Sequence, residues 1–466
     1  MSTASTPLIE TPSQVAPLGI PPESSQPSAS LAPRFSGMVS WGTKGGLALL
    51  DQGLFAGAHF LLNVLLARWL PPAEYGAFAL AYSVFLLVAS LHGAMLLEPM
   101  MIFGSGRYKT ARKNYLWIVL RGHWALTLPA SLLLIALAFV VGRLYTPSVT
   151  YALLALGVVL PLLLLMWFTR RAFYIELLPG WSTAGSAVYF LLLLAATAWL
   201  FQAGRLTPVT AILAMGAASL LVAAMQVVRL RPASHSLPGG VTSKSAARDH
   251  WQYGRWALAS AAAMWFPINI YYLALPAWAG MEGAGALKAL MNLANPVLHS
   301  LIALGMLIVP LLVRHRDRGG IRLMQQTISR LAGLFLLGSA AYLAALWYFR
   351  VEILQLLYGG KYMEYSGAPV LLVGLLPIAA SLTLTLGSAL RALERPDRLF
   401  WCYLASSGVA LLLGLPLLAY FGLTGALAGL LGSYVATAAA MYFFVRRSDS
   451  GATQIPDAVA PASEVT

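Results

Sequence analysis

The sequence predicts an all-α polytopic membrane protein with twelve transmembrane helices, and three observations lead to this class. Of the 466 residues, 59% are hydrophobic and 10% are charged, and the mean hydropathy is +0.74. Soluble domains carry about 25% charged residues, so this composition excludes a soluble enzyme, a disordered protein and a nucleic-acid-binding protein. The other two observations are a series of continuous apolar runs and an uneven distribution of Lys and Arg. The single cysteine, Cys402, excludes a disulfide framework and a thiolate metal site.

Twelve apolar runs are long enough to cross a bilayer as helices. About 20 residues, at roughly 1.5 Å each, span the ~30 Å hydrocarbon core. Their continuity also excludes a β-barrel, whose strands alternate in hydrophobicity over about ten residues. The expected spans are 46–67, 75–97, 119–141, 150–168, 183–202, 208–228, 256–278, 291–313, 331–349, 368–390, 399–420 and 424–445.

The remaining segments divide the chain into tails and halves. The Pro- and Ser-rich residues 1–44 and the terminal residues 446–466 are expected to be disordered cytoplasmic tails, since neither can bury a core. Residues 231–255 contain Pro, Gly and Ser and are expected to form a cytoplasmic linker. It separates a first bundle of six helices, 45–230, from a second bundle, 256–445.

The Lys and Arg residues indicate the orientation of these spans. With the N-terminus in the cytoplasm, 24 of the 30 Lys and Arg residues fall in inner segments and six in outer segments. Such a bias over short loops is the positive-inside signal, so the net charge of +14 is explained by topology rather than by cargo. Both termini are therefore expected on the cytoplasmic side. The six outer residues are Arg68, Arg143, Arg205, Lys288, Arg350 and Lys361.

The loops after the first and seventh spans are weakly similar. Leu70–Gly76 reads LPPAEYG and Trp278–Ala284 reads WAGMEGA, so an offset of 208 residues aligns Glu74 with Glu282. Repeated halves with a binding site at their interface are a transporter design.

Several motifs follow one another along the chain. They are LLARWLPPAEYGAFAL from Leu65, YGRWA from Tyr253, ALMNLANP from Ala289, LYGGKY from Leu357 and FGLTGA from Phe421. In these motifs and their order, the chain resembles the polysaccharide exporters and O-antigen-type flippases of the multidrug/oligosaccharidyl-lipid/polysaccharide (MOP) superfamily over about residues 45–445. This resemblance implies two six-helix bundles around a central cavity, as in MATE transporters, that opens alternately inward and outward.

Polar residues within the first span form a stripe. Gln52, His59 and Asn63 fall within about 20° of one another on a helix with 3.6 residues per turn. Because the resemblance places this span beside the cavity, the stripe predicts substrate contacts. The alternative is helix–helix hydrogen bonding, which is common for these residue types in membrane bundles.

Two carboxylates are candidates for ion coupling. Asp51 lies near the inner end of the first span, and Glu98 lies at the inner interface. Ionisable residues in a span invite a functional interpretation. The alternatives are structural: Asp51 pairs with Lys44 or an inner-loop Arg, and Glu98 forms a surface ion pair.

Polar and cationic residues elsewhere complete the predicted substrate site. Asn292 and His299 share a helix face, and Arg and Lys residues near span ends suit a phosphate-bearing cargo. The Arg170-Arg171 pair is expected either to hold anionic lipid or only to fix topology. The predicted substrate-binding residues are Gln52, His59, Asn63, Arg121, Arg255, Asn269, Lys288, Asn292 and His299.

The function predicted from the resemblance is a flippase. Its cargo would be an oligosaccharide linked to polyprenyl pyrophosphate, moved across the bacterial cytoplasmic (inner) membrane. The main alternative is a cation-coupled exporter of drugs or small amphiphiles; weaker alternatives are a lipid II flippase and a polytopic glycosyltransferase or ligase. No enzyme activity, cofactor, metal or nucleic-acid partner is expected. Membrane lipid, a polysaccharide polymerase and glycosyltransferases are candidate partners.

Overall fold

Helices are the only regular secondary structure in the residues that the computed structural model describes, 32–141, 143–232, 241–393 and 395–452. Packing divides the chain into residues 1–43, whose described part is helical, and residues 44–466, which hold the other helices. Helix therefore occupies the end of the first predicted tail and reaches Ala452 in the second. The rest of both predicted tails lies outside the described residues.

The described residues of the first half form six long helical segments, one for each predicted span. Most of them begin at a proline. Proline lacks a backbone N–H, and the first N–H groups of a helix have no intrahelical acceptor, so nothing is lost at that position. The segments are α1 (Ala32–Trp69), α2 (Pro72–His92) continued by η1 (Gly93–Leu97) and α3 (Glu98–Ser105), α4 (Arg112–Val141), α5 (Pro147–Ile175), α6 (Pro179–Gln202) and α7 (Pro208–Leu230).

The second half also provides six spans, although the helices merge at sharp turns. Gly320 and Gly422 adopt positive φ angles of 64° and 54°, and only glycine enters that region without strain. Each glycine divides one long helix into two spans. The elements are α8 (Ser243–Ala274), α9 (Pro276–Tyr348), α10 (Arg350–Tyr358), η2 (Met363–Tyr365), α11 (Ala368–Ala392), α12 (Pro396–Val409), η3 (Ala410–Gly414) and α13 (Leu415–Ala452).

By length and composition, ten helices of the described residues can cross a membrane. One of the ten, Asp397–Arg447, contains the last two predicted spans, and the first part of α9 is not among the ten. That part carries Glu282 and Lys288. The predicted fold class, twelve helical spans in two bundles, is confirmed, and the protein is a multi-pass membrane protein.

Two predicted boundaries differ from the structure. Thr242 caps α8, so its helix begins at Ser243, and residues 243–255 of the predicted linker are helical; residues 233–240 lie outside the described part. The eighth span begins near Gly280 rather than at residue 291. Hydropathy placed this start too late because of the two charged residues in the first turns of the span.

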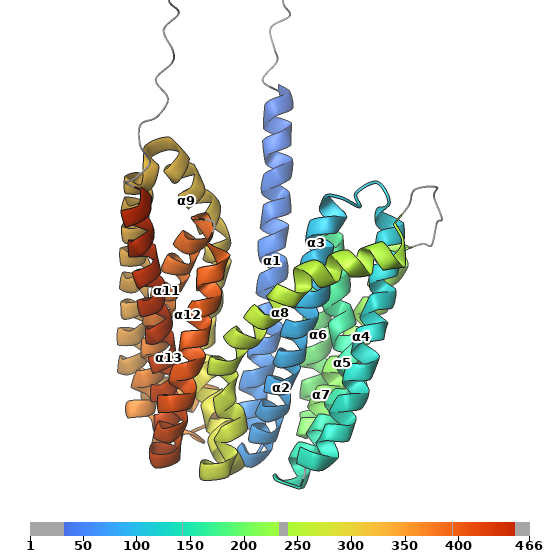
Figure 1. The fold of residues 1–466 in the computed structure, drawn as a ribbon. Helices are drawn as coiled ribbons and strands as arrows, with labels where there is room; N and C mark the ends of the chain where they lie inside the picture. Colours follow the sequence, from blue (N-terminus) through green and yellow to red (C-terminus); the bar gives the residue numbers. More distant parts are fainter. Residues whose placement is uncertain (1–31, 142, 233–240, 394, 453–466) are drawn as a thin grey trace, which may run out of the picture. The chain divides into compact units, whose positions relative to one another are not determined.

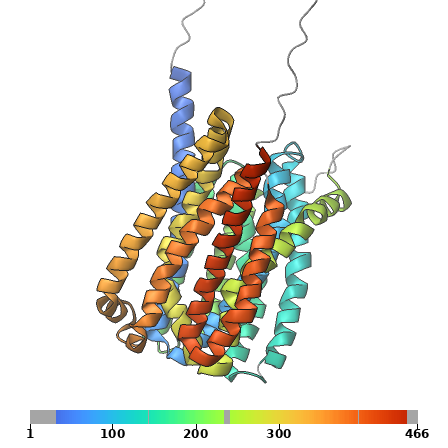
Figure 2. The same cartoon turned by 60° about the vertical axis from the view of Figure 1, so that its left-hand side comes forward.

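Neighbouring helices pack within each half. In Figures 1 and 2, α11, α12 and α13 of the second half lie side by side with the later part of α9. The helices α4, α5, α6 and α7 of the first half form a separate group. The helix α8 runs obliquely and contacts α2, η1 and α3 as well as α12 and α13. It therefore joins the two halves.

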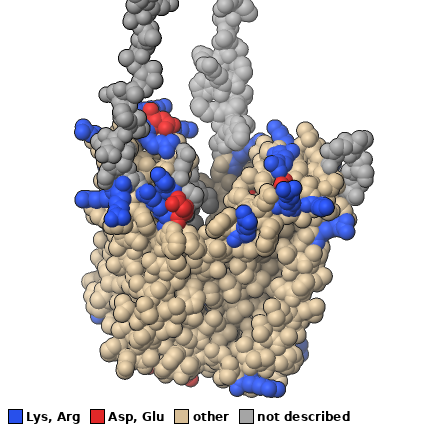
Figure 3. Space-filling view, viewed as in Figure 1, with Lys and Arg blue, Asp and Glu red and all other residues tan. Residues whose placement is uncertain are grey.

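Lys and Arg gather at one end of residues 44–466, which we call the basic end (Figure 3). Ion pairs join helices there: Arg107 Nη1 lies 2.6 Å from Asp249 Oδ2, and Arg112 Nη1 lies 3.2 Å from Glu176 Oε2. The hydrogen bond from Arg107 and the negative charge of Asp249 raise the pKa of the guanidinium. Which side of the membrane this end faces remains a prediction from its charge.

Candidate functional site

The first half contains a buried ion pair between Asp51 and Arg170. Asp51 on α1 is fully buried, and its Oδ2 lies 2.9 Å from Arg170 Nη2 of α5. Hydroxyl groups of Tyr174, Ser182 and Ser186 also donate to the carboxylate. Arg170 and Tyr174 are four residues apart on α5, and the two serines are four apart on α6, so each pair shares a helix face. Five side chains from three helices thus form one polar cluster.

This cluster bears on the predictions for Asp51 and for the Arg170-Arg171 pair. Burying an ion pair is costly unless further hydrogen bonds satisfy it, and here three hydroxyls do so. Arg170 is 7% exposed and faces Asp51 rather than lipid, whereas Arg171 is exposed. Of the two alternatives for the pair, lipid contact therefore does not fit Arg170, whose partner is Asp51. Pairing with an inner-side Arg was the structural alternative for Asp51. A coupling role for Asp51 stays a prediction.

A row of aromatic rings leads from this cluster to a second cation. The Arg170 guanidinium lies 3.9 Å from the Phe55 ring centroid, and Phe55 contacts His59 edge-on at 4.7 Å. The His59 ring is 6.0 Å from that of Tyr82, and Lys288 Nζ lies 4.5 Å from the Tyr82 centroid. Cations attract the faces of aromatic rings, so each end of this aromatic row is occupied by a positive charge.

Lys288 lies inside α9 and not in an outer loop, which corrects its predicted position. It is 7% exposed, and its Nζ also lies 5.7 Å from the Tyr272 ring centroid. Among the described residues it forms no ion pair. A buried ammonium without a counter-ion is costly, and such a group is a candidate site for an anionic ligand.

A hydrogen-bonded bridge connects the halves next to Lys288. Asn292 Nδ2 donates to Tyr75 Oη over 3.0 Å, and Tyr75 donates to Asn63 Oδ1 over 3.4 Å. Asn63 in turn donates to the His59 carbonyl over 2.7 Å. All three side chains are buried, and Asn292 Oδ1 has no partner among the described groups. The bridge joins α1, α2 and α9.

The halves meet most closely at the end opposite the basic end. A Cβ added to Gly76 of α2 would lie 1.9 Å from the Met281 carbonyl oxygen. A Cβ added to Gly285 of α9 would lie 2.3 Å from the Pro72 carbonyl oxygen. The contact is reciprocal: Met281 follows Pro72, and Gly285 follows Gly76, by the same 209 residues. This interval is one residue longer than the offset predicted from the loops.

Polar contacts surround this glycine contact, and we call them the clasp. Lys361 Nζ donates to the Leu70 carbonyl over 2.8 Å, and Arg68 Nη1 donates to the Leu356 carbonyl over 2.6 Å. Partial burial lowers the pKa of Lys361. Residues from the two halves therefore hold each other at this end.

The structure brings together five of the predicted site residues and leaves the others apart. Asp51, His59, Asn63, Lys288 and Asn292 belong to the clusters above. His299 on α9 is exposed. The remaining predictions are Gln52, Arg121, Arg255 and Glu98, which are exposed, and Asn269, which is buried and donates to the Trp265 carbonyl of its own helix.

Sequence reasoning missed Phe55, Tyr82, Tyr75 and Tyr272, and it named Arg170 without pairing it with Asp51. A usable signal existed for Arg170, since a carboxylate within an apolar span requires a cation and hydroxyl donors. The aromatic residues carried no such signal, because tyrosine and phenylalanine are common throughout the spans. Among the described residues no group of three or more His, Cys, Asp or Glu side chains could hold a metal ion.

Comparisons with known proteins identify the fold. No family model matches the chain, and no curated protein matches it in sequence. Among solved structures, an inward-facing multidrug resistance MATE transporter of the MOP superfamily has a TM-score of 0.75 at 10% identity, covering 88% of this chain and 99% of that chain. An outward-facing structure of a MATE transporter of that superfamily has a TM-score of 0.63 at 11% identity, covering 88% and 96%.

A flippase shares the fold as well. The lipid II flippase MurJ, in an inward closed conformation, has a TM-score of 0.69 at 10% identity, covering 87% of each chain. A MOP superfamily transporter from Pyrococcus furiosus, described as having a binding pocket of reverse polarity, has a TM-score of 0.62 at 12% identity, covering 88% of this chain and 95% of that chain. The chain therefore has the fold of MOP superfamily transporters.

Proposed function

We propose that this protein is a flippase for an anionic lipid-linked oligosaccharide, of the polyprenyl-pyrophosphate type, in a bacterial cytoplasmic membrane. The observation that carries the proposal is Lys288, a cation buried at the contact between the halves with no carboxylate beside it. Phosphate oxygens would supply the missing negative charge. The tyrosine and asparagine groups of the neighbouring bridge supply donors and acceptors for sugar hydroxyls.

Alternating access fits this arrangement. Structures with this fold include ones described as inward-facing and outward-facing. Parting the glycine contact and the clasp would open the site on one side, and closing the other end would seal it. We place the basic end in the cytoplasm, following the positive-inside rule.

The second candidate function is a cation-coupled multidrug exporter. The MATE similarity supports it as well as it supports a flippase, because fold does not determine cargo. A cationic drug needs a carboxylate that is free to receive it, whereas Asp51 already accepts from Arg170 and three hydroxyls. This electrostatic difference favours an anionic cargo.

Replacing Lys288 with methionine is expected to reduce transport about 10- to 150-fold, because a hydrogen bond to a charged group contributes roughly 1.5–3 kcal/mol. The same change should leave the melting temperature of the purified protein equal or higher, since an unpaired buried charge is removed. Transport is measured as the accumulation of lipid-linked sugars on the cytoplasmic face in cells that depend on the variant.

The matched control is Lys109→Met, which removes an exposed lysine and should transport normally. If deletion of the gene causes no accumulation of lipid-linked intermediates, the flippase proposal is wrong. Export of cationic dyes that is lost in the deletion strain would support the exporter instead.

A further inference from the structure

The second half contains a partly open cavity of about 540 Å³ that shares no residue with the Asp51 cluster, the aromatic row or the asparagine bridge. Its walls come from α8, α9, α11, α12 and α13. Small-molecule sites commonly measure about 300–1,000 Å³ and are mostly apolar with a few polar groups. This cavity matches that description, since leucines, alanine, valine, proline and methionine form much of its wall.

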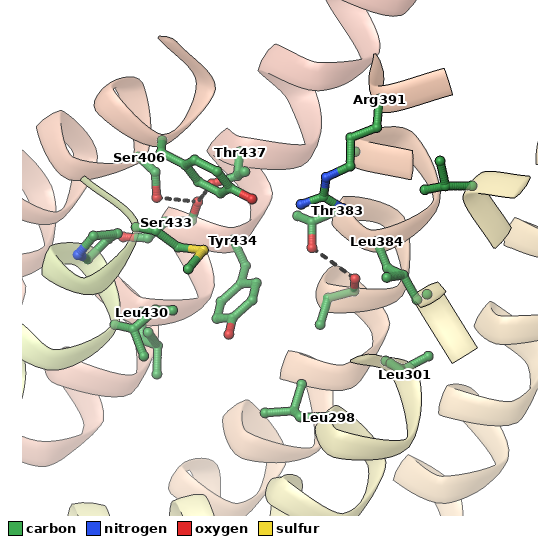
Figure 4. Close-up of a pocket in the computed structure, with 18 residues that line it drawn as sticks. Leu298, Leu301, Thr383, Leu384, Arg391, Ser406, Leu430, Ser433, Tyr434 and Thr437 are labelled. Atoms are coloured by element: carbon green, nitrogen blue, oxygen red, sulfur yellow. Dashed lines mark hydrogen bonds between the residues drawn. The ribbon is translucent and has the colours of Figure 1, made fainter. Parts of the chain in front are cut away.

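The cavity has Arg391 at one end and leucines at the other, where the Tyr434 hydroxyl is the labelled polar group (Figure 4). Arg391, an exposed residue in the last turn of α11, extends toward Thr383 at the cavity wall. Leu298 and Leu301 lie at the opposite end. A molecule filling this space would therefore have a polar group at one end and an apolar body.

Arg391 is the group that can select a ligand by charge. The hydroxyls of Thr383, Ser406 and Thr437 donate to carbonyls, the last two both to Ser433. Arg391 interacts with Tyr403 and forms no ion pair with any carboxylate of the described residues. Its guanidinium is left with planar, forked N–H donors that match carboxylate and phosphate oxygens.

The position of Arg391 also matches the way an amphiphile lies in a bilayer. It stands at the basic end of a transmembrane helix, where headgroups lie, and the leucine end of the cavity is deeper in the span. An amphiphile with its anionic group at Arg391 would keep its chain directed toward the hydrocarbon core.

We propose that this cavity binds a single-chain anionic amphiphile, an apolar chain that carries a phosphate or a carboxylate. The anionic group contacts Arg391, and the chain runs along Leu298, Leu301 and Leu430. Each buried methylene contributes about 0.8 kcal/mol, so the chain provides affinity and the arginine provides selectivity for charge. The proposal holds whether the transported cargo is anionic or cationic, since the cavity is separate from the Lys288 site.

Native mass spectrometry of the purified full chain tests this proposal with three probes of equal chain length: dodecyl phosphate, laurate and dodecyltrimethylammonium. We expect one dodecyl phosphate or laurate to bind per chain, at least tenfold more tightly than dodecyltrimethylammonium. Binding of dodecyl phosphate but not of laurate would indicate a prenyl-phosphate or phospholipid source, and binding of laurate but not of dodecyl phosphate would indicate a fatty acid. Binding of the cationic probe as strong as that of both anions would overturn the proposal.

Two variants locate the binding. Arg391→Gln should weaken binding of the anionic probe at least tenfold, whereas Arg395→Gln, which removes an exposed arginine four residues further on, should not change it. Leu298→Trp should weaken binding by filling the apolar end while Arg391 stays intact. Unchanged binding in Arg391→Gln means that the anion binds elsewhere and refutes the proposal. These measurements involve no transport, so they stand apart from the Lys288→Met experiment.

Discussion

Replacing Arg170 with methionine will destabilise the protein by about 3–5 kcal/mol, because the change leaves a buried carboxylate without its cation. Asp51 has no exposed surface, and the three hydroxyls that remain can donate hydrogen bonds but carry no charge. The expected result is a large loss of folded protein in detergent, measured by thermal unfolding monitored on size-exclusion chromatography.

A double variant separates structural and coupling roles of the carboxylate. Asp51→Asn combined with Arg170→Met removes both charges and keeps an acceptor for the hydroxyls, so it should restore most of the stability. Arg171→Met is the matched control, since that neighbouring arginine is exposed. If the restored double variant transports normally, Asp51 does not carry a coupling ion; if it folds but no longer couples transport to an ion gradient, the coupling prediction is supported.

Replacing Gly76 with alanine will separate α2 and α9, because the new Cβ would lie 1.9 Å from a backbone oxygen that cannot rotate away. Overpacking of this kind costs about 1–3 kcal/mol or more. The state in which this contact is closed should lose population by roughly 5- to 150-fold relative to a state in which it is open. Transport should fall because the cycle needs both states.

Cysteine labelling measures this shift. Cys402 is buried and is the only native cysteine, so it is replaced by serine before a reporter, Ala294→Cys, is introduced in α9. Ala294 is fully buried, and its cysteine should react faster from the end opposite the basic end when Gly76 is alanine. Gly285→Ala should act in the same way, whereas Gly53→Ala, where a Cβ meets no atom within 4 Å, should not. Equal labelling in all three variants would mean that the glycine contact does not control access.

The number of spans could be predicted from the sequence because each span satisfies its own backbone and shows its apolar length locally. The start of the eighth span was misplaced for the same reason: Lys288 interrupts the apolar run, and nothing in the neighbouring sequence indicates that its ammonium rests on tyrosine rings. Charge counting then assigned this residue to an outer loop. The residue that now carries the proposed function was thus in the predicted set, but in the wrong surroundings.

The partners of buried polar groups were beyond prediction because they are distant in sequence. Asp51 and Arg170 are separated by 119 residues, and Tyr75 and Asn292 by 217. Helical periodicity predicts which residues share a face but not which helix that face meets. Gln52 illustrates this limit, since it shares the stripe with His59 and Asn63 but is exposed while Asn63 is buried.

The reciprocal glycine contact would serve as a pivot with a long lever arm while it stays closed and the other end opens. The helical segment that begins at this contact, Pro72–Ser105, has 34 residues, which corresponds to about 50 Å along the helix axis. A rigid rotation of about 10° around the glycines would move its far end by roughly 9 Å while shifting the contact itself by a fraction of an ångström. In the proposed transport cycle, small residues at such a pivot would convert a minor change in local packing into a large displacement at the far end of the segment.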